Sequence, residues 1–123
     1  MERCIKFRGK RIDNGIWITG SETYIKDGDG VWLSEDIDVI KVIPETVCQF
    51  TGLYERNGNG EEIYEDDIVE YNNASGNTLR GVIKYYKDGF DIFRNGISDC
   101  SIRGLCGIKV IGNIHDDKEL INN

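Results

Sequence analysis

The stretch GEEIYEDDIVEY, residues 60–71, carries the strongest indication of the fold. Its second half alternates as a β-strand does, which places Val69 and Tyr71 on the inner face and Ile68 on the outer face. Asp67 then lies at the strand entrance, where its carboxylate is expected to accept backbone N–H bonds from the preceding turn. The stretch also holds six carboxylates: Glu61, Glu62, Glu65, Asp66, Asp67 and Glu70.

These carboxylates are open to two interpretations. A metal or acid/base site needs carboxylates that converge from separate elements, or the D-x-D spacing of a calcium loop with a glycine in its turn. The run 61–70 has neither feature. We therefore expect structural and solubilising acids, and we predict no metal site, no cofactor and no catalytic residues.

Length and composition favour one small β-rich domain. The 123 residues suffice for a single domain core. Fifteen glycines against one proline favour many tight turns between short strands. Nothing approaches the roughly 18 consecutive apolar residues of a membrane span. The start, MERCIKFRGKR, is basic without the apolar segment of a secretory signal, so a cytoplasmic location is expected.

Alternation and turn residues predict short strands along most of the chain. Residues 14–15, 88–89 and 95–96 are Asn-Gly or Asp-Gly pairs, which form hairpin turns because they accept positive φ. Pro44 ends a strand because it cannot donate to the ladder. The expected strands are 4–8, 16–19, 23–26, 31–34, 38–43, 47–50, 67–72, 79–86, 90–94, 97–103 and 108–114.

Such strands predict a sandwich or barrel. We expect residues 1–46 to form β-hairpins and residues 47–123 to hold an antiparallel barrel of about five strands, closed or nearly closed. The boundary is soft, and residues 44–51 are its best position. The expected core positions of the barrel are Val69, Val82, Ile83, Ile92, Val110 and Ile111.

The C-terminus gives the one helical signal. Asp116 precedes Glu119 by three residues, as in a capping box, and predicts about one helical turn. So short a turn is marginal unless Leu120 and Ile121 dock on the barrel.

Cysteine and histidine positions argue against zinc and against nucleophilic catalysis. The four cysteines are Cys4, Cys48, Cys100 and Cys106, with no C-x-x-C pair. We expect reduced thiols used as small apolar side chains. The one histidine, His115, is expected to cap or to hydrogen-bond locally. Walker A, G-x-S-x-G and H-E-x-x-H motifs are absent from the sequence, so no enzyme is predicted.

The net charge of −7 opposes nonspecific nucleic-acid binding. The bases are nevertheless concentrated at the start, where Lys6, Arg8 and Lys10 would share one strand face. We expect a solvated stripe there, and a phosphate contact is the alternative. The aromatic residues are numerous enough that some could serve recognition: Trp17, Trp32, Tyr24, Tyr54, Tyr64, Tyr85 and Tyr86.

Four segments, in this order, carry a family resemblance: FRGKRIDNGIWITGS (7–21), VIPETVCQFTGLYERNGNGEEIYEDDIVEY (42–71), GVIKY (81–85) and VIGNIHDDKELI (110–121). They resemble the YopX family of phage and prophage proteins of Gram-positive bacteria. The resemblance implies a small SH3-like barrel in the C-terminal half, with the N-terminal strands packed on or beside it. It supplies no catalytic residues.

One position departs from the family pattern. Members usually have E-G-D-I-V, and this chain has Asp66 in place of that glycine. Aspartate is among the non-glycine residues most tolerant of left-handed φ, so we expect the turn to survive and its surroundings to be more acidic.

Three functions remain open. The first is a non-enzymatic module whose barrel loops and exposed aromatic residues bind a host protein, a phage protein or another copy of itself. Two copies would pair through strand edges, with the basic arm of one meeting the acidic run of the other. The second is a nucleic-acid-associated protein that uses the basic N-terminal strand and stacking aromatics. The third is a small hydrolase or transferase that uses clustered acids. The first explains the acidity, the missing motifs and the fold.

Overall fold

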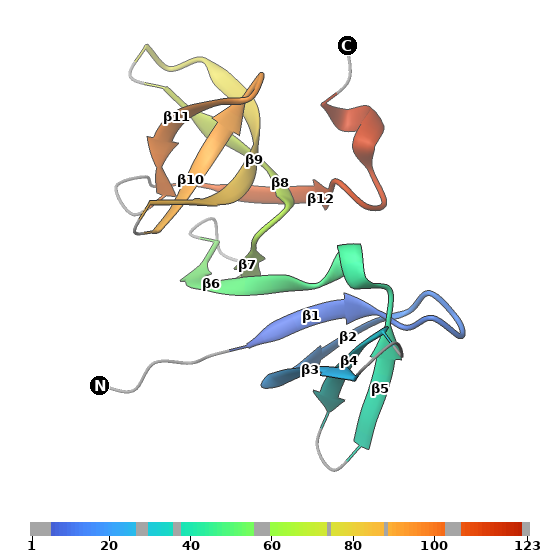
Figure 1. Ribbon diagram of the computed structural model, residues 1–123. Coiled ribbons are helices and arrows are strands. Elements are labelled where there is room, and N and C mark those ends of the chain that lie inside the picture. The colour runs from blue at the N-terminus through green and yellow to red at the C-terminus, as the bar shows by residue number, and fades with distance from the viewer. Residues whose placement is uncertain are drawn as a thin grey trace. The chain divides into compact units, whose positions relative to one another are not determined.

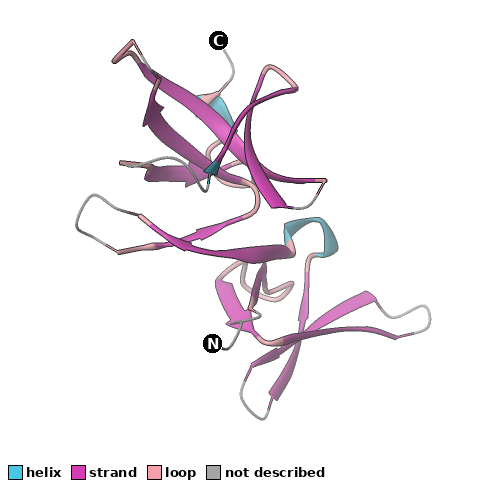
Figure 2. Ribbon diagram, turned by 90° about the vertical axis from the view of Figure 1, so that its left-hand side faces the viewer, coloured by secondary structure: helices cyan, strands magenta, loops and turns pink. Residues whose placement is uncertain are grey.

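The computed structural model describes residues 6–26, 30–35, 38–55, 60–73, 75–87, 89–102 and 107–121. The chain forms two compact units, Met1–Gly52 (unit 1) and Leu53–Asn123 (unit 2). Antiparallel strands build both units (Figure 1), and the described residues form only short 3-10 turns and no α-helix (Figure 2). The mainly β prediction is confirmed. No helix in the described residues has the length and apolar character to cross a membrane.

The elements of unit 1 are β1 (Phe7–Lys10), β2 (Trp17–Gly20), β3 (Glu22–Lys26), β4 (Gly30–Glu35), β5 (Asp38–Val42), the 3-10 turn η1 (Pro44–Thr46) and β6 (Cys48–Tyr54). Strands β2, β1 and β6 pair in that order, and β3, β4 and β5 form a second sheet. A bridge between Arg11 and Val42 joins the ends of β1 and β5. The unit boundary falls inside β6, just past the stretch favoured by the sequence.

Turn chemistry sets the first hairpin of unit 1. The side-chain oxygen of Asn14 accepts the Ile16 N–H at 2.9 Å, and Gly15 has a φ of +71°. The predicted turn is therefore confirmed, with its strands starting slightly later than expected. The predicted residues Cys4 and Ile5 lie outside the described residues.

A small apolar cluster holds unit 1 together. Ile18, Leu33 and Val42 are buried at its centre. A Cβ at Gly20 would lie 1.8 Å from the Ser34 carbonyl oxygen. Only glycine therefore allows β2 to approach β4 this closely.

The elements of unit 2 are the last residues of β6, β7 (Glu62–Tyr64), β8 (Asp67–Asn72), β9 (Thr78–Tyr86), β10 (Gly89–Arg94), β11 (Ile97–Ser101), β12 (Lys109–Asn113) and the 3-10 turn η3 (Lys118–Leu120). The sheet order β11-β10-β9-β8-β12 is a meander whose last strand returns beside the first. The strands predicted here are confirmed within a few residues. As described, none of the three sheets closes on itself.

The core of unit 2 contains Val69, Ile83 and Ile92, as predicted, each with no exposed surface. Val82, Val110 and Ile111 are only half-buried. The register between β12 and β8 shifts between Val110 and Gly112, and this bulge interrupts the alternation at Ile111. The other buried members of this core are Ile63, Tyr71, Ile102 and Ile108.

Two details of unit 2 differ from the sequence prediction. Ile68, expected on an outer face, is fully buried, so β8 is covered on both faces. The helical turn expected from Asp116 is replaced by a turn on Asn113, whose side-chain oxygen accepts the N–H groups of His115 and Asp116. Asparagine competes with helical hydrogen bonding in this way, and the 3-10 turn starts only at Lys118.

Candidate functional site

Asp67 fixes the turn between β7 and β8. Its carboxylate accepts the Tyr64 N–H at 2.8 Å, and the residue is 1% exposed. This confirms the role expected from the sequence. Because the bond goes to a backbone donor, the charge of Asp67 serves the local fold and is not presented to solvent.

The backbone of Asp66, the residue before Asp67, forms hydrogen bonds with two other segments. Its φ is +72°, the left-handed conformation expected from the family's glycine. Its N–H donates to the Ile83 carbonyl at 2.7 Å, and its carbonyl accepts the Ile114 N–H at 3.0 Å. The turn therefore joins β9 to the segment that follows β12.

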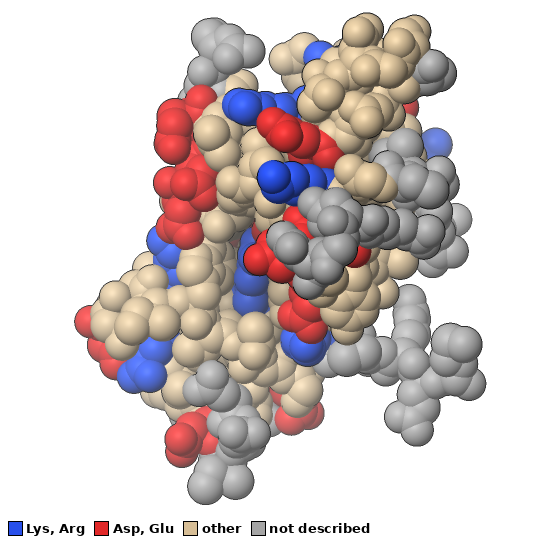
Figure 3. All heavy atoms as spheres, turned by 180° about the vertical axis from the view of Figure 1, so that it is seen from behind, with Lys and Arg blue, Asp and Glu red and all other residues tan. Residues whose placement is uncertain are grey.

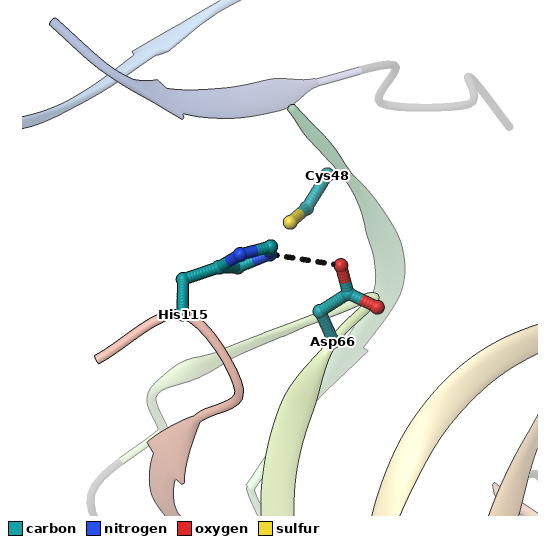
Figure 4. A group of neighbouring side chains, drawn as sticks. All are labelled: Cys48, Asp66 and His115. Carbon is teal, nitrogen blue, oxygen red and sulfur yellow. Dashed lines mark hydrogen bonds and ion pairs between the residues drawn. The ribbon is translucent and has the colours of Figure 1, made fainter. Parts of the chain in front are cut away.

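The side chain of Asp66 joins the same segments again (Figure 4). Its carboxylate lies 2.6 Å from the Lys84 ammonium. It also lies 3.0 Å from Nε2 of His115, the contact that the dashed line in Figure 4 marks. The greater acidity expected of this turn stays a prediction, and Lys84 offsets part of the added charge. The backbone N–H of His115 donates to the nearby Asn113 side chain, and its ring reaches a residue 49 positions earlier.

This cluster has a structural and a chemical interpretation. A carboxylate that orients an imidazole is one part of a general-base arrangement, which also needs a nucleophile and oxyanion donors. Asp66 instead uses both its backbone and its carboxylate to hold β9 and the C-terminal segment, which favours a structural tie. Cys48, also drawn in Figure 4, belongs to unit 1, where its thiol donates to the Thr46 carbonyl at 3.1 Å.

Glu55 is a buried carboxylate that no sequence pattern indicates. It is 5% exposed, and its Oε1 accepts the Val110 N–H at 2.6 Å. Its own N–H donates to the Glu61 carbonyl. Within the described chain its Oε2 is buried without a hydrogen-bond partner. Glu55 therefore links Glu61 to β12 at the cost of burying a polar group.

The remaining acids of the 60–71 stretch do not converge. The Glu62 carboxylate accepts the Tyr64 hydroxyl at 2.8 Å, and that of Glu70 lies 3.3 Å from Arg80. Glu61 is exposed. The absence of a metal site remains a prediction.

A groove of about 790 Å³ lies on unit 2 along β9. Its walls come from β9, the β10–β11 turn and the C-terminal 3-10 segment. Its lining contains four cations, Arg80, Lys84, Arg94 and Lys118, and no carboxylate. The apolar part of the lining is Leu79, Val82, Phe93, Ile114, Leu120 and Ile121.

Two of the four groove cations are bonded within unit 2, and the other two are exposed. Arg80 bonds Glu70 and the Leu120 carbonyl, both at 3.3 Å, and Lys84 is paired with Asp66. Arg94 and Lys118 are exposed and make no ion pair with any residue that the structure describes. These two are the groove cations available to a bound partner.

The basic N-terminal strand is not the freely solvated stripe expected from the sequence. Lys6 lies over the ring of Phe50 at 5.4 Å, and Arg8 and Lys10 lie over Trp17 at 4.8 and 5.5 Å. All three cations are half-buried. On the face shown in Figure 3, blue and red side chains alternate and form no continuous positive stripe across the described part.

Exposure of the aromatic residues could not be predicted from the sequence. Tyr54, Tyr85 and Tyr86 are exposed, whereas Tyr64 is buried. Trp17 and Trp32 are half-buried, and the side chain of Tyr24 lies outside the described residues.

These observations define the class of protein: a small, mainly β protein of two units, with a cation-lined groove on the second. The chain belongs to the YopX family, whose model, described as YopX protein, matches residues 6–122. A comparison with curated proteins finds no match.

Proposed function

We propose that this protein is a non-enzymatic protein-interaction module whose binding face is the groove of unit 2. The observation that carries the proposal is the lining, which combines apolar side chains with exposed cations. At about 790 Å³ the groove is large enough to receive several side chains of a partner.

The same lining argues against an enzyme. General acid–base or nucleophilic catalysis draws on histidine, carboxylates, serine, cysteine and a few other groups placed within hydrogen-bond reach of the substrate. The groove lining contains no histidine, cysteine, serine or carboxylate. Its lysines and arginines suit recognition of a charged partner.

The proposal also includes an SH3-like barrel fold for unit 2 and a phage or prophage origin for the protein. The order of five strands, with the last returning beside the first, supports an SH3-like barrel for unit 2. The family supports an origin in a phage or prophage. Cys48 and Cys100 form no disulfide with any described residue, which suits the reducing cytoplasm of a bacterial host.

Self-association is a second form of the proposal, and an exposed edge favours it. Among the described residues, β11 is the last strand of the five-stranded sheet, and Ile97 at its start is 71% exposed. Unpaired edges that carry apolar side chains invite pairing with another chain. A second copy is therefore a candidate partner at this edge.

A photoreactive residue in the groove tests the proposal. A benzophenone side chain at Thr78, an exposed lining residue, should crosslink a specific protein in the bacterial host, whereas the same group at exposed Thr23 in unit 1 should not. The partner so identified should bind purified Val82→Lys at least about tenfold more weakly than the parent chain, because a buried cation replaces apolar contact. Equal affinity for the two chains would refute the groove as the binding face.

A further inference from the structure

We infer that the groove binds an extended peptide in which carboxylates alternate with apolar side chains. The inference rests on the proposed function and names the chemistry of the partner. It is carried by the charge of the lining, by the direction of the groove and by its apolar floor.

The charge of the lining is opposite to that of the chain. The chain carries a net charge of −7, yet the groove is lined by four cations and no acid. Arg80 and Lys84 are already paired with Glu70 and Asp66, so they contribute little net field. Arg94 and Lys118 leave a local excess of positive charge that complements carboxylates.

The two available cations lie on different walls. Arg94 ends β10, and Lys118 begins η3. The guanidinium of Arg94 can take a carboxylate with two parallel hydrogen bonds, whereas Lys118 offers a mobile point charge. A segment that lies between these walls can place one carboxylate toward each.

The direction of the groove favours an extended occupant. Residues 78–82 and 84 of β9 all line it. A strand rises about 3.3 Å per residue, so this wall is about 20 Å long, the length of about six extended residues. Gly81 allows β9 to lie close against β10 beside the groove, because a Cβ there would meet Ile92 at 2.3 Å and the Arg94 stem at 3.3 Å.

The apolar floor excludes a purely electrostatic ligand. Val82 and Phe93 lie on neighbouring strands, and Leu120 belongs to the C-terminal wall. These side chains gain by burial against apolar groups of a partner. Single-stranded nucleic acid is less favoured, because two available cations fall short of the roughly 6–10 phosphate contacts typical of strong nonspecific binding.

Defined peptides test the inference on the full chain. Fluorescence anisotropy would compare a labelled six-residue peptide of alternating glutamate and leucine with peptides in which lysine replaces glutamate or glutamate replaces leucine, and with an oligo-dT strand. We expect the Glu/Leu peptide to bind best. The double variant Arg94→Glu/Lys118→Glu should weaken it about tenfold, because two exposed ion pairs are lost.

Controls separate charge, position and fold. Lys109→Glu reverses an exposed charge on β12, away from the groove lining, and should leave the affinity unchanged. The double variant should gain affinity for the Lys/Leu peptide, which a merely misfolded chain would not do.

The outcomes distinguish the inference from the proposed function. If the parent chain prefers the Lys/Leu peptide or oligo-dT, or if the double variant binds Glu/Leu as the parent does, the inference is wrong. A partner that still crosslinks through Thr78 would then leave the proposed function intact. If the Glu/Leu peptide binds and crosslinks only outside the groove, both are overturned.

Discussion

Asp66 combines a left-handed backbone conformation with two contacts of its carboxylate. The left-handed φ of +72° costs little for aspartate or asparagine, and more for other side chains. The side chains of Asp66 and His115 are poorly exposed, so their hydrogen bond matters more than one on an open surface, whereas the Lys84 side chain is 42% exposed and its ion pair is more strongly screened.

Asp66→Asn should therefore destabilise the protein by about 1–3 kcal/mol, because it keeps the backbone tolerance and loses the charge. Asp66→Ala should cost roughly 1 kcal/mol more, because alanine tolerates left-handed φ less well. Urea unfolding measures both. Glu61→Gln, on an exposed acid of the same stretch, should have no effect. If Asp66→Asn has the same urea midpoint as the parent, Asp66 does not stabilise the junction of β9 with the C-terminal segment.

Tyr71 gives a prediction about alkaline stability. Burial, and then the hydrogen bond that its hydroxyl donates to Asp99, raise the pKa of Tyr71 above its ordinary value of 10.0. A raised pKa means that the stabilisation is complete below pH 10 and is lost as the pH rises toward the folded value, because the unfolded chain loses its proton first.

Tyr71→Phe should cost about 1 kcal/mol at pH 8, from the lost hydrogen bond. It should also lose less stability than the parent when the pH is raised above 10, because the titrating group has been removed. Urea unfolding across this pH range is the measurement. Tyr85→Phe, at an exposed ring, is the matched control, and parallel alkaline losses in Tyr71→Phe and the parent would refute the prediction.

At the scale of elements, the approach of β2 to β4 depends on a missing side chain. Gly20→Ala would place a Cβ 1.8 Å from the Ser34 carbonyl oxygen, so one strand must move. We expect a loss of about 1–3 kcal/mol in the free energy of unfolding, as for other overpacked sites. Gly89→Ala, where a Cβ meets nothing within 4 Å, should be neutral. Equal thermal midpoints for the two variants would show that β2 does not depend on this contact.

The β7–β8 segment gives a prediction about metals. Asp66 and Asp67 already serve Lys84, His115 and the Tyr64 N–H, so they have little left to offer a hard cation. Calorimetric titration with Mg²⁺, Mn²⁺ or Ca²⁺ should find no site tighter than roughly millimolar. A micromolar site that Asp66→Asn abolishes would overturn this expectation.

Most strands could be predicted, because hydrophobic alternation and turn residues are local signals. β8 was found at its full length, Asp67–Asn72, from the sequence alone. The contact of His115 with Asp66 could not be found, because no pattern relates residues 49 positions apart. The groove could not be predicted for the same reason, because one of its walls forms only when the C-terminal segment folds beside β9. The exposed edge of β11 likewise depends on the sheet order.

At the scale of the whole molecule, the pairing of the basic arm with the acidic run of another copy stays a prediction. Lys6, Arg8 and Lys10 lie over aromatic rings, and Asp66 and Asp67 are engaged within unit 2. The exposed start of β11 is a further candidate surface for pairing between copies. Removal of residues 1–11 is no clean test, because β1 is paired on both sides in its sheet.

Light scattering at about 100 µM should show a mass above that of the monomer that falls on dilution, as mass action requires. Ile97→Lys should shift the chain toward monomer, because it places a charge on the apolar edge. Ile16→Lys, at another exposed isoleucine, should not change the mass. A strict monomer in both low and high salt would dispose of self-association and leave only a foreign partner.

The return of β12 to the side of β8 has a consequence for synthesis on the ribosome. β8, β9, β10 and β11 are made in succession and can pair as they emerge, but β8 must wait for residues 109–113 before its second edge is covered. Contacts this distant in sequence form slowly, and an uncovered edge is prone to aggregate meanwhile. Nascent chains stalled before residue 109 should therefore remain sensitive to protease, and release of β12 should mark the moment at which unit 2 becomes resistant.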